Sequence, residues 1–332
     1  MTLSNPLPLL GPHLPIFILS TIFFYAIQLA SHRLSPKLVS KYAEFDKRTR
    51  IGWATHVVSM VHAILVIPLA FQCLQSTILS LDPVFGYDPF VGHVLAFSSG
   101  YFLWDTIDSL LNSSIGFVVH GAACLAVYMF SFRPFLAGFG PPFLLWELST
   151  PLLNIHWFMD KSGLSTRYPT FFLVNALLFM LVFFLARIVY GGANSVLFFQ
   201  TMWTERHRIP LHLHLIYCTG NLALNGLNWL WFSKMLKKMY ARIQGEDTPD
   251  PKSDSSSSSS STMKTAKDKL ANGERQPLLA DAKRGEASST SSPVNQENEQ
   301  PNHHDESGRE GSLSLPANPP SPVLAKRDTE EW

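Results

Sequence analysis

Apolar stretches of nearly bilayer-spanning length follow one another through the first 244 residues. A transmembrane helix needs about 20 mostly apolar residues to cross a hydrocarbon core of about 30 Å. We predict an all-α integral membrane protein, a bundle of six to seven transmembrane helices. Six is the alternative because the fourth stretch is short and follows the third after three residues, so these two could form one tight hairpin. The seven stretches are Leu14–Ser31, Trp53–Leu74, Val91–Leu111, Ile115–Phe132, Pro141–Phe158, Phe171–Tyr190 and Leu211–Phe232.

The charges that flank these stretches predict their direction. No Lys or Arg precedes Leu14, whereas a signal peptide carries positive charge before its apolar region. Lys and Arg concentrate in cytoplasmic segments. With the N-terminus outside and the C-terminus inside, twelve flanking cations are cytoplasmic and three are not. The sequon at Asn112 then faces the cytosol and stays unglycosylated. The twelve are Arg33, Lys37, Lys41, Lys47, Arg48, Arg50, Lys161, Arg167, Lys234, Lys237, Lys238 and Arg242, and the three are Arg133, Arg206 and Arg208.

The composition supports a membrane protein and argues against several soluble classes. The chain is 46% hydrophobic and 15% charged, whereas soluble proteins carry about 25% charged residues. No dense basic patch with interleaved aromatic residues is present, which argues against nucleic-acid binding. The three cysteines lie in apolar runs without metal-ligand spacing, and His212 and His214 diverge on a helix, so we predict no metal site. Neither a phosphate-binding glycine loop nor a nucleophile elbow occurs.

The last part of the chain differs sharply from the first. Residues 1–244 contain 16 Lys/Arg and 9 Asp/Glu, whereas residues 245–332 contain 10 and 16. An uninterrupted serine run covers Ser255–Ser261, and this composition cannot bury enough apolar surface to fold. We predict a disordered cytosolic tail over 245–332. Within it, Glu274 followed by Leu278 and Leu279 resembles the acidic dileucine signals that sorting adaptors bind.

Polar residues inside the predicted membrane helices are the main indication of a site. A charged residue at mid-membrane costs about 2.5–3.5 kcal/mol on insertion scales and normally faces the bundle interior. Asp105 and Asp108 lie one turn apart, and His62 shares a helix face with Thr55 and Ser59. Such groups either bind a ligand or hold the helices together through mutual hydrogen bonds. The others are His120, Glu147, Asn154, Arg187, His214, Asn221, Asn225 and Asn228.

Several of these residues fall in motifs that resemble the TLC domain, the family named for TRAM, Lag1 and CLN8. The likeness spans roughly Arg48 to Lys238, and its most specific part is Glu147-Leu148-Ser149-Thr150-Pro151 followed by Asn154 and Trp157. It is nearest to the branch outside the ceramide synthases, especially the one found in fungi. The other matching residues are Trp53, Val58-Ser59, His62-Ala63, Gly100-Tyr101, Asp105, His120 and Arg187-Ile188.

The resemblance implies a six-helix barrel with an extra N-terminal helix. We therefore divide the chain into an N-terminal helix with its basic loop (1–47), a TLC domain (48–244) and the tail (245–332). Ceramide synthases join a fatty acyl-CoA to a sphingoid base and carry adjacent histidines on one helix. Here position 121 is Gly, so only His120 maps onto that motif.

Three functions follow, and none of them needs a cofactor. The first is lipid homeostasis, in which a polar-lined bundle binds a membrane lipid through His62, Asp108, Asn154, Arg187, Asn221 and Asn225. The second is an acyl-CoA-dependent N-acyltransferase with His120 as general base and Asp105 or Glu147 as its catalytic partner. The third is a trafficking or scaffold role that depends on the tail. The family resemblance implies the endoplasmic reticulum, with a vacuolar or endosomal membrane as the alternative.

Overall fold

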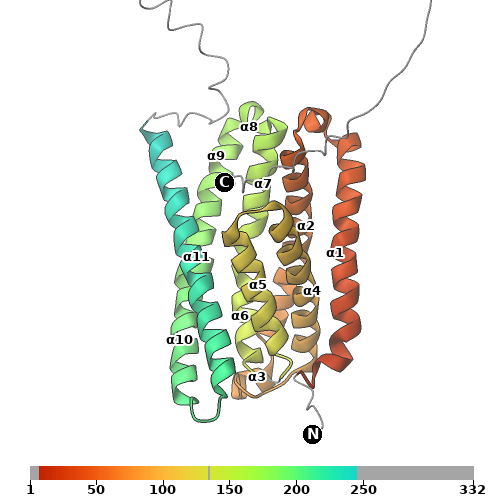
Figure 1. The fold of residues 1–332 in the computed structure, drawn as a ribbon. Helices are drawn as coiled ribbons and strands as arrows, with labels where there is room; N and C mark the ends of the chain where they lie inside the picture. The colour runs from red at the N-terminus through yellow and green to blue at the C-terminus, as the bar shows by residue number, and fades with distance from the viewer. Residues whose placement is uncertain (1–6, 134, 245–332) are drawn as a thin grey trace, which may run out of the picture. The chain divides into compact units, whose positions relative to one another are not determined.

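The computed structural model describes residues 7–133 and 135–244. The predicted tail and its dileucine-like residues, Glu274, Leu278 and Leu279, lie outside the described residues. Among those described, the chain forms helices and no β-strand, as predicted (Figure 1). The helices are α1 (Leu10–Leu38), η1 (Ser40–Glu44), α2 (Lys47–Cys73), α3 (Thr77–Leu81), α4 (Pro89–Asn112), α5 (Ile115–Phe130), η2 (Ala137–Phe139), α6 (Gly140–Leu144), η3 (Leu145–Ser149), α7 (Thr150–Ser162), α8 (Leu164–Arg167), α9 (Pro169–Phe183), η4 (Phe184–Tyr190), α10 (Gly191–Thr204) and α11 (Leu211–Ile243).

Three helical runs are long and apolar enough to cross a membrane: Leu10–Leu38, Lys47–Cys73 and Pro169–Thr204. A shorter apolar helix covers Ile115–Phe130. Helices α4 and α11 have spanning length, with 24 and 33 residues, but their Asp and Asn residues lower the mean hydropathy. Each of the seven predicted stretches coincides with helix in the structure. The length and apolar character of these helices identify an integral membrane protein.

The structure differs from the predicted stretches at two places. The sixth stretch was expected to end at Tyr190, but the helical run continues through η4 and α10 to Thr204. Gly191 lies in close packing within this run, since a Cβ there would lie 2.1 Å from Nε1 of Trp146. The fifth stretch is interrupted, because the 3₁₀ turn η3 separates α6 from α7. The third and fourth form the expected tight hairpin, α4–α5, with only Ser113 and Ser114 between them.

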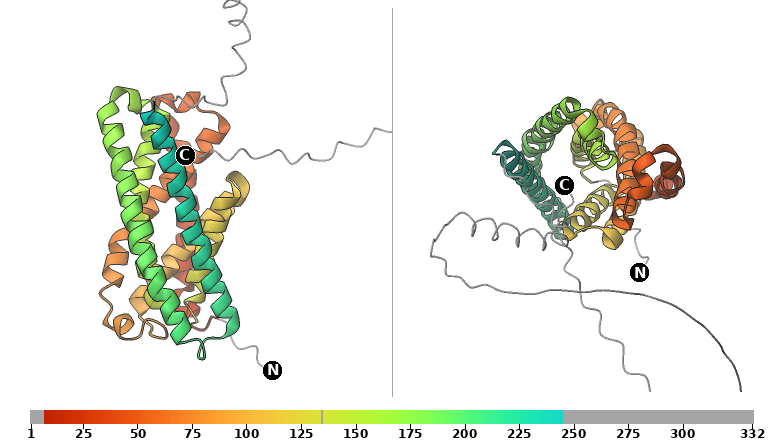
Figure 2. Two further views of the ribbon diagram at one scale, coloured as in Figure 1. Left: turned by 90° about the vertical axis from the view of Figure 1, so that its left-hand side faces the viewer. Right: turned by 90° about the horizontal axis from the view of Figure 1, so that it is seen from above.

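Helix α1 packs against α4 through small residues. Gly92, Ala96 and Gly100 recur every four residues along α4, a spacing that lets two helix backbones approach closely. The hydroxyl of Ser20 on α1 donates to the carbonyl oxygen of Phe97 at 2.6 Å. Viewed from above, α1 lies outside the ring that the other long helices form, as the family resemblance implied (Figure 2).

Helix α4 begins at a well-capped turn outside the apolar region. The Oδ1 atom of Asp88 accepts hydrogen bonds from the backbone N–H groups of Phe90 and Val91. The Ser76 hydroxyl donates to the other carboxylate oxygen at 2.6 Å. The hydrogen bond from Ser76 has the largest effect on this carboxyl. Together with the two backbone hydrogen bonds it lowers the pKa of Asp88 below its usual value. The cap fixes where the α4–α5 hairpin starts.

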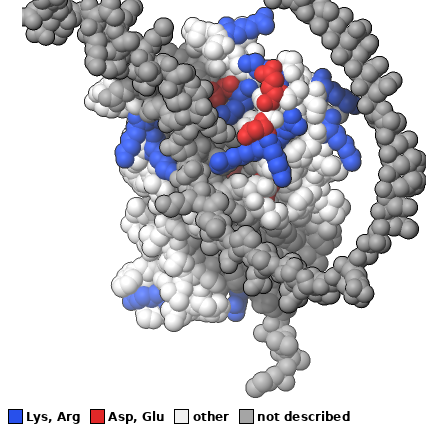
Figure 3. Space-filling view, turned by 45° about the horizontal axis from the view of Figure 1, so that its top comes forward, with Lys and Arg blue, Asp and Glu red and all other residues white. Residues whose placement is uncertain are grey.

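Basic side chains gather at the end of the bundle where α1 and α11 finish (Figure 3). This end includes η1 and the first turn of α2, together with α8. The opposite end carries Arg133, Arg206 and Arg208. The asymmetry predicted along the sequence is therefore an asymmetry in space, and it remains the basis for an N-out, C-in orientation.

Candidate functional site

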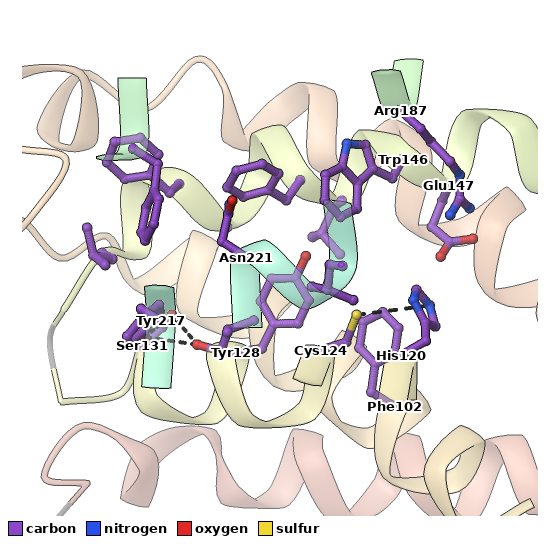
Figure 4. Close-up of a pocket in the computed structure, with 18 residues that line it drawn as sticks. Phe102, His120, Cys124, Tyr128, Ser131, Trp146, Glu147, Arg187, Tyr217 and Asn221 are labelled. Carbon is purple, nitrogen blue, oxygen red and sulfur yellow. Dashed lines mark hydrogen bonds between the residues drawn. The ribbon is translucent and has the colours of Figure 1, made fainter. Parts of the chain in front are cut away.

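An elongated cavity lies inside the bundle between α4, α5, α6, η3, η4, α10 and α11 (Figure 4). It contains about 680 Å³ of space between atoms, counting its open side. We call this cavity the slot. Polar side chains from three elements, His120, Glu147 and Arg187, line one end.

Helix α5 provides one wall of this slot. His120, Cys124, Val127, Tyr128 and Ser131 recur at helical spacing and all face the cavity. At 1.5 Å rise per residue, His120 and Ser131 are separated by about 16 Å along the helix axis. The wall therefore runs from the polar end to the opposite, aromatic end.

Arg187 is held in place by neutral oxygen atoms. Its Nε donates to the Ser149 hydroxyl at 3.0 Å, and its Nη atoms donate to Thr150 and Asn228 at 3.4 Å each. It belongs to the π-helical turn η4, and π-helical turns are frequent at functional sites. Glu147, in η3, interacts with Arg187 electrostatically. Both side chains are buried, so the polar end holds one acidic and one basic group shielded from lipid.

His120 stands between aromatic rings and a thiol. Its ring centroid lies 6.2 Å from that of Phe102 and 5.5 Å from that of Trp231. Its Nε2 lies 4.0 Å from the Sγ of Cys124, one helical turn further along α5. The imidazole can therefore accept a proton from the thiol in the tautomer protonated at Nδ1.

The residue after His120 explains why the second histidine of the ceramide synthase motif is missing. Gly121 faces α4, and a Cβ there would lie 2.7 Å from Oδ2 of Asp105 and 3.1 Å from the backbone nitrogen of Thr106. A histidine at position 121 cannot fit without separating α5 from α4. The close packing of this hairpin therefore allows a single histidine in the motif.

The opposite end of the slot is aromatic. Phe139 and Phe198 meet edge to face with centroids 5.7 Å apart. The Tyr217 hydroxyl donates to the carbonyl oxygens of Val127 at 2.9 Å and Phe135 at 3.3 Å. Since these bonds use the hydroxyl hydrogen, Tyr217 presents mainly its ring to the cavity.

The structure brings four of the predicted site residues to this cavity: His120, Glu147, Arg187 and Asn221. The other five lie elsewhere. Asp105 sits at the α4–α5 contact beside Gly121. The Asp108 side chain instead points toward α1 and α2, where it accepts hydrogen bonds from Gln28 and Thr55. The carboxylates of Asp105 and Asp108 therefore have different surroundings.

The remaining three predicted residues contact neighbouring helices. His62 is fully buried and stacks on Tyr101 with centroids 3.7 Å apart. Within the described residues neither of its ring nitrogens has a hydrogen-bond partner. The Oδ1 atom of Asn154 lies 2.6 Å from Nδ1 of His56 on α2, and Asn225 donates to Ser195 on α10 at 2.9 Å.

Sequence reasoning missed several residues that line the slot. Cys124, Tyr128, Trp146 and Tyr217 all face it, but each looked like an ordinary apolar or aromatic position. For Cys124 and Tyr128 a signal existed, because they lie four and eight residues after His120 on one helix face.

Comparisons with known proteins match this architecture to one family. The model of the TLC domain matches residues 52–237. An uncharacterized TLC domain-containing protein of Schizosaccharomyces pombe is 36% identical over 72% of this chain and 83% of its own length. Topoisomerase I damage affected protein 4 of Saccharomyces cerevisiae is 32% identical over 68% of this chain and 84% of its own. TLC domain-containing protein 4 of Homo sapiens is 28% identical over 68% and 90%. No solved structure matches significantly.

Proposed function

This chain belongs to the TLC domain family, and from this premise we propose that it affects membrane lipid composition by binding a lipid in the internal slot. The observation that carries the proposal is the slot itself. It has aromatic walls suited to an acyl chain, and at one end His120, Glu147 and Arg187 are suited to a polar headgroup.

Polar groups this deep in a membrane protein need a reason. Arg187 and Glu147 are buried, and ionisable residues in membrane helices generally mark ligand or ion pathways. Interhelical hydrogen bonds account for Asp108, Asn154 and Asn225. Glu147, His120 and Arg187 instead line the slot. A lipid headgroup bound in the slot would contact these three groups.

A matched pair of leucines on α11 tests lipid binding directly. Leu224 lines the slot, whereas Leu222 is 62% exposed on the outer surface of the same helix. Leu224→Trp should fill the slot and lower the amount of lipid that co-purifies with the protein in native mass spectrometry. Leu222→Trp should leave it unchanged. Equal lipid retention by the wild type and Leu224→Trp, with both folded, would contradict the proposal.

Lipid profiles of cells separate this function from the alternatives. Cells lacking the protein should show altered phospholipids with constant ceramides, and wild-type protein should restore them. Ceramides restored by the wild type but not by His120→Ala would instead support an acyl-CoA-dependent N-acyltransferase. Unchanged lipids would favour the trafficking role and direct attention to the tail and its sorting adaptors.

We also propose the endoplasmic reticulum as the compartment, on the basis of the family resemblance. A vacuolar or endosomal membrane is the alternative that the dileucine-like segment suggests. Fluorescence microscopy of the full chain, compared with Leu278→Ala/Leu279→Ala, separates the two. An endosomal location that the double variant abolishes would contradict the first proposal.

A further inference from the structure

One side chain in the slot has chemistry that the proposed function does not use. Cys124 lines the slot on α5, with its Sγ 4.0 Å from Nε2 of His120. The other two cysteines are placed differently: Cys73 is buried at the end of α2, and Cys218 borders a separate groove with Trp203 and His214. The slot therefore contains one thiol, and that thiol has a base beside it.

The surroundings of this thiol combine a nucleophile, a base and a cation. A thiol reacts as the thiolate, so it needs a group to take its proton, and a neutral imidazole at hydrogen-bond distance is the usual one. Arg187 acts electrostatically on both Cys124 and His120. Its guanidinium lines the slot and carries a full positive charge on five N–H donors. Such a cation can stabilise negative charge on a carbonyl oxygen.

The walls of the slot indicate which reaction suits this thiol. Phe102, Val127 and Leu224 supply apolar walls. An addition reaction, which releases nothing, suits such a slot better than a transfer reaction.

We propose that Cys124 is a covalent acceptor for electrophilic single-chain lipids, namely α,β-unsaturated aldehydes and ketones on an alkyl chain. The proposal rests on the proposed function only in that a lipid chain must enter the slot. Such electrophiles arise from the oxidation of unsaturated acyl chains and partition into the bilayer that surrounds the protein. The consequence would be a protein that responds to oxidised lipid as well as binding intact lipid.

The step is a conjugate addition whose atoms balance without a co-reactant. The Sγ atom forms a bond to the β carbon while the thiol proton moves to Nε2 of His120. The electron pair of the carbon–carbon double bond shifts to the α carbon and carbonyl oxygen, where Arg187 stabilises the enolate. The proton then passes from His120 to the α carbon. The net change is addition of S–H across the double bond.

The test uses the purified full chain and two alkyne-tagged probes, dodecenone and its saturated counterpart dodecanone. Peptide mass mapping of the wild type locates each adduct without relying on a variant. We expect dodecenone to modify Cys124 at least tenfold faster than Cys218, and dodecanone to modify neither. Water-soluble methyl vinyl ketone, which has no alkyl chain, should lose this preference for Cys124.

Variants then test the roles of the two partners. Cys124→Ser should abolish the dodecenone adduct, whereas Cys218→Ser should retain it. His120→Gln should slow the addition by about 100-fold, the contribution expected of a general base. Modification mainly at Cys73 or Cys218, or a rate unaffected by His120→Gln, would overturn the proposal. If the wild type co-purifies with lipid but its Cys124 does not react with dodecenone, this proposal alone is overturned. If the wild type retains no lipid, the result counts against the proposed function.

Discussion

The Asp108 carboxylate joins three helices at one point. Gln28 on α1 and Asn112 on α4 donate to Oδ1 at 2.9 and 3.0 Å, and Thr55 on α2 donates to Oδ2 at 2.8 Å. The sequence grouped Asp108 with lipid-binding residues, and the structure gives it three protein donors. Its role is therefore tested best through stability.

Replacing this carboxylate should loosen the bundle without emptying the slot. Asp108→Ala leaves three donors without their acceptor, two of them on other helices, and interhelical hydrogen bonds in membrane proteins contribute about 0.6 kcal/mol on average and up to about 1.7 kcal/mol. We expect the free energy of unfolding to fall by about 1–3 kcal/mol, with lipid retention unchanged in the folded fraction. Chemical unfolding in detergent measures the first quantity, and native mass spectrometry the second. Asp160→Ala, which removes an exposed partner of Lys161, is the control.

A second residue-scale prediction concerns the two glycines of α5. A Cβ at Gly121 would lie 2.7 Å from Asp105 and 3.1 Å from the backbone of α4, whereas at Gly116 it would meet only Leu227 at 3.6 Å. Gly121→Ala should therefore lower the free energy of unfolding by about 1–3 kcal/mol through overpacking. Gly116→Ala should leave it unchanged or raise it by up to about 1 kcal/mol through helix propensity.

Thermal unfolding of Gly121→Ala and Gly116→Ala, measured side by side, tests this prediction. A Gly121→Ala variant as stable as Gly116→Ala would show that α4 and α5 can separate at no cost. In that case a second histidine would be sterically possible, and packing would no longer explain its absence.

At the scale of elements, the contact between α1 and α4 depends on Gly100. A Cβ at this position would lie 2.3 Å from Oγ of Ser20 and 2.7 Å from the backbone oxygen of Phe17. Gly100→Ala should displace α1 from the ring, because the Phe17 backbone cannot rotate out of the way. We expect faster proteolysis between α1 and α2 and a lower unfolding midpoint. Gly226→Ala, with nothing within 4 Å of its added Cβ, should match the wild type in both assays.

The elements also show where sequence patterns suffice and where they fail. Apolar length predicted seven stretches that all coincide with helix, because burial in lipid forces the backbone to satisfy its hydrogen bonds within a helix. It could not predict η3, or the continuation past Gly191. These depend on partners from distant segments, such as Trp146 against Gly191 and Ser149 with Arg187.

The same limit applies to the candidate site. His120 and Asp108 are both ionisable residues in apolar helices, so the sequence marks them equally. Only the rotation of each helix about its axis decides that His120 faces the slot and Asp108 faces α1. Cys124 is the opposite example. The sequence indicated only a buried apolar side chain, whereas the structure places its thiol in the slot, 4.0 Å from Nε2 of His120.

For the molecule as a whole, the structure supplies a spatial basis for the predicted orientation. The N-terminal end of α1 and the loop between α10 and α11 lie at one end of the bundle, and the basic residues cluster at the other (Figure 3). Helix α4 runs toward the basic end and finishes at Asn112, and the α4–α5 hairpin turns before it reaches that end (Figure 1). Glycosylation of the sequon therefore reports on the side of the membrane that the turn of this hairpin faces.

Glycosylation mapping in a eukaryotic cell measures this orientation. Because Lys and Arg favour the cytoplasmic side, Asn112 should remain unmodified and a sequon added before Met1 should be glycosylated. A sequon added after Trp332 should remain unmodified, since α11 finishes at the basic end of the bundle (Figure 1). Sensitivity to an N-glycosidase distinguishes true glycans from other shifts in mobility. A glycan at Asn112 would invert the topology and place the polar end of the slot nearer the outer leaflet.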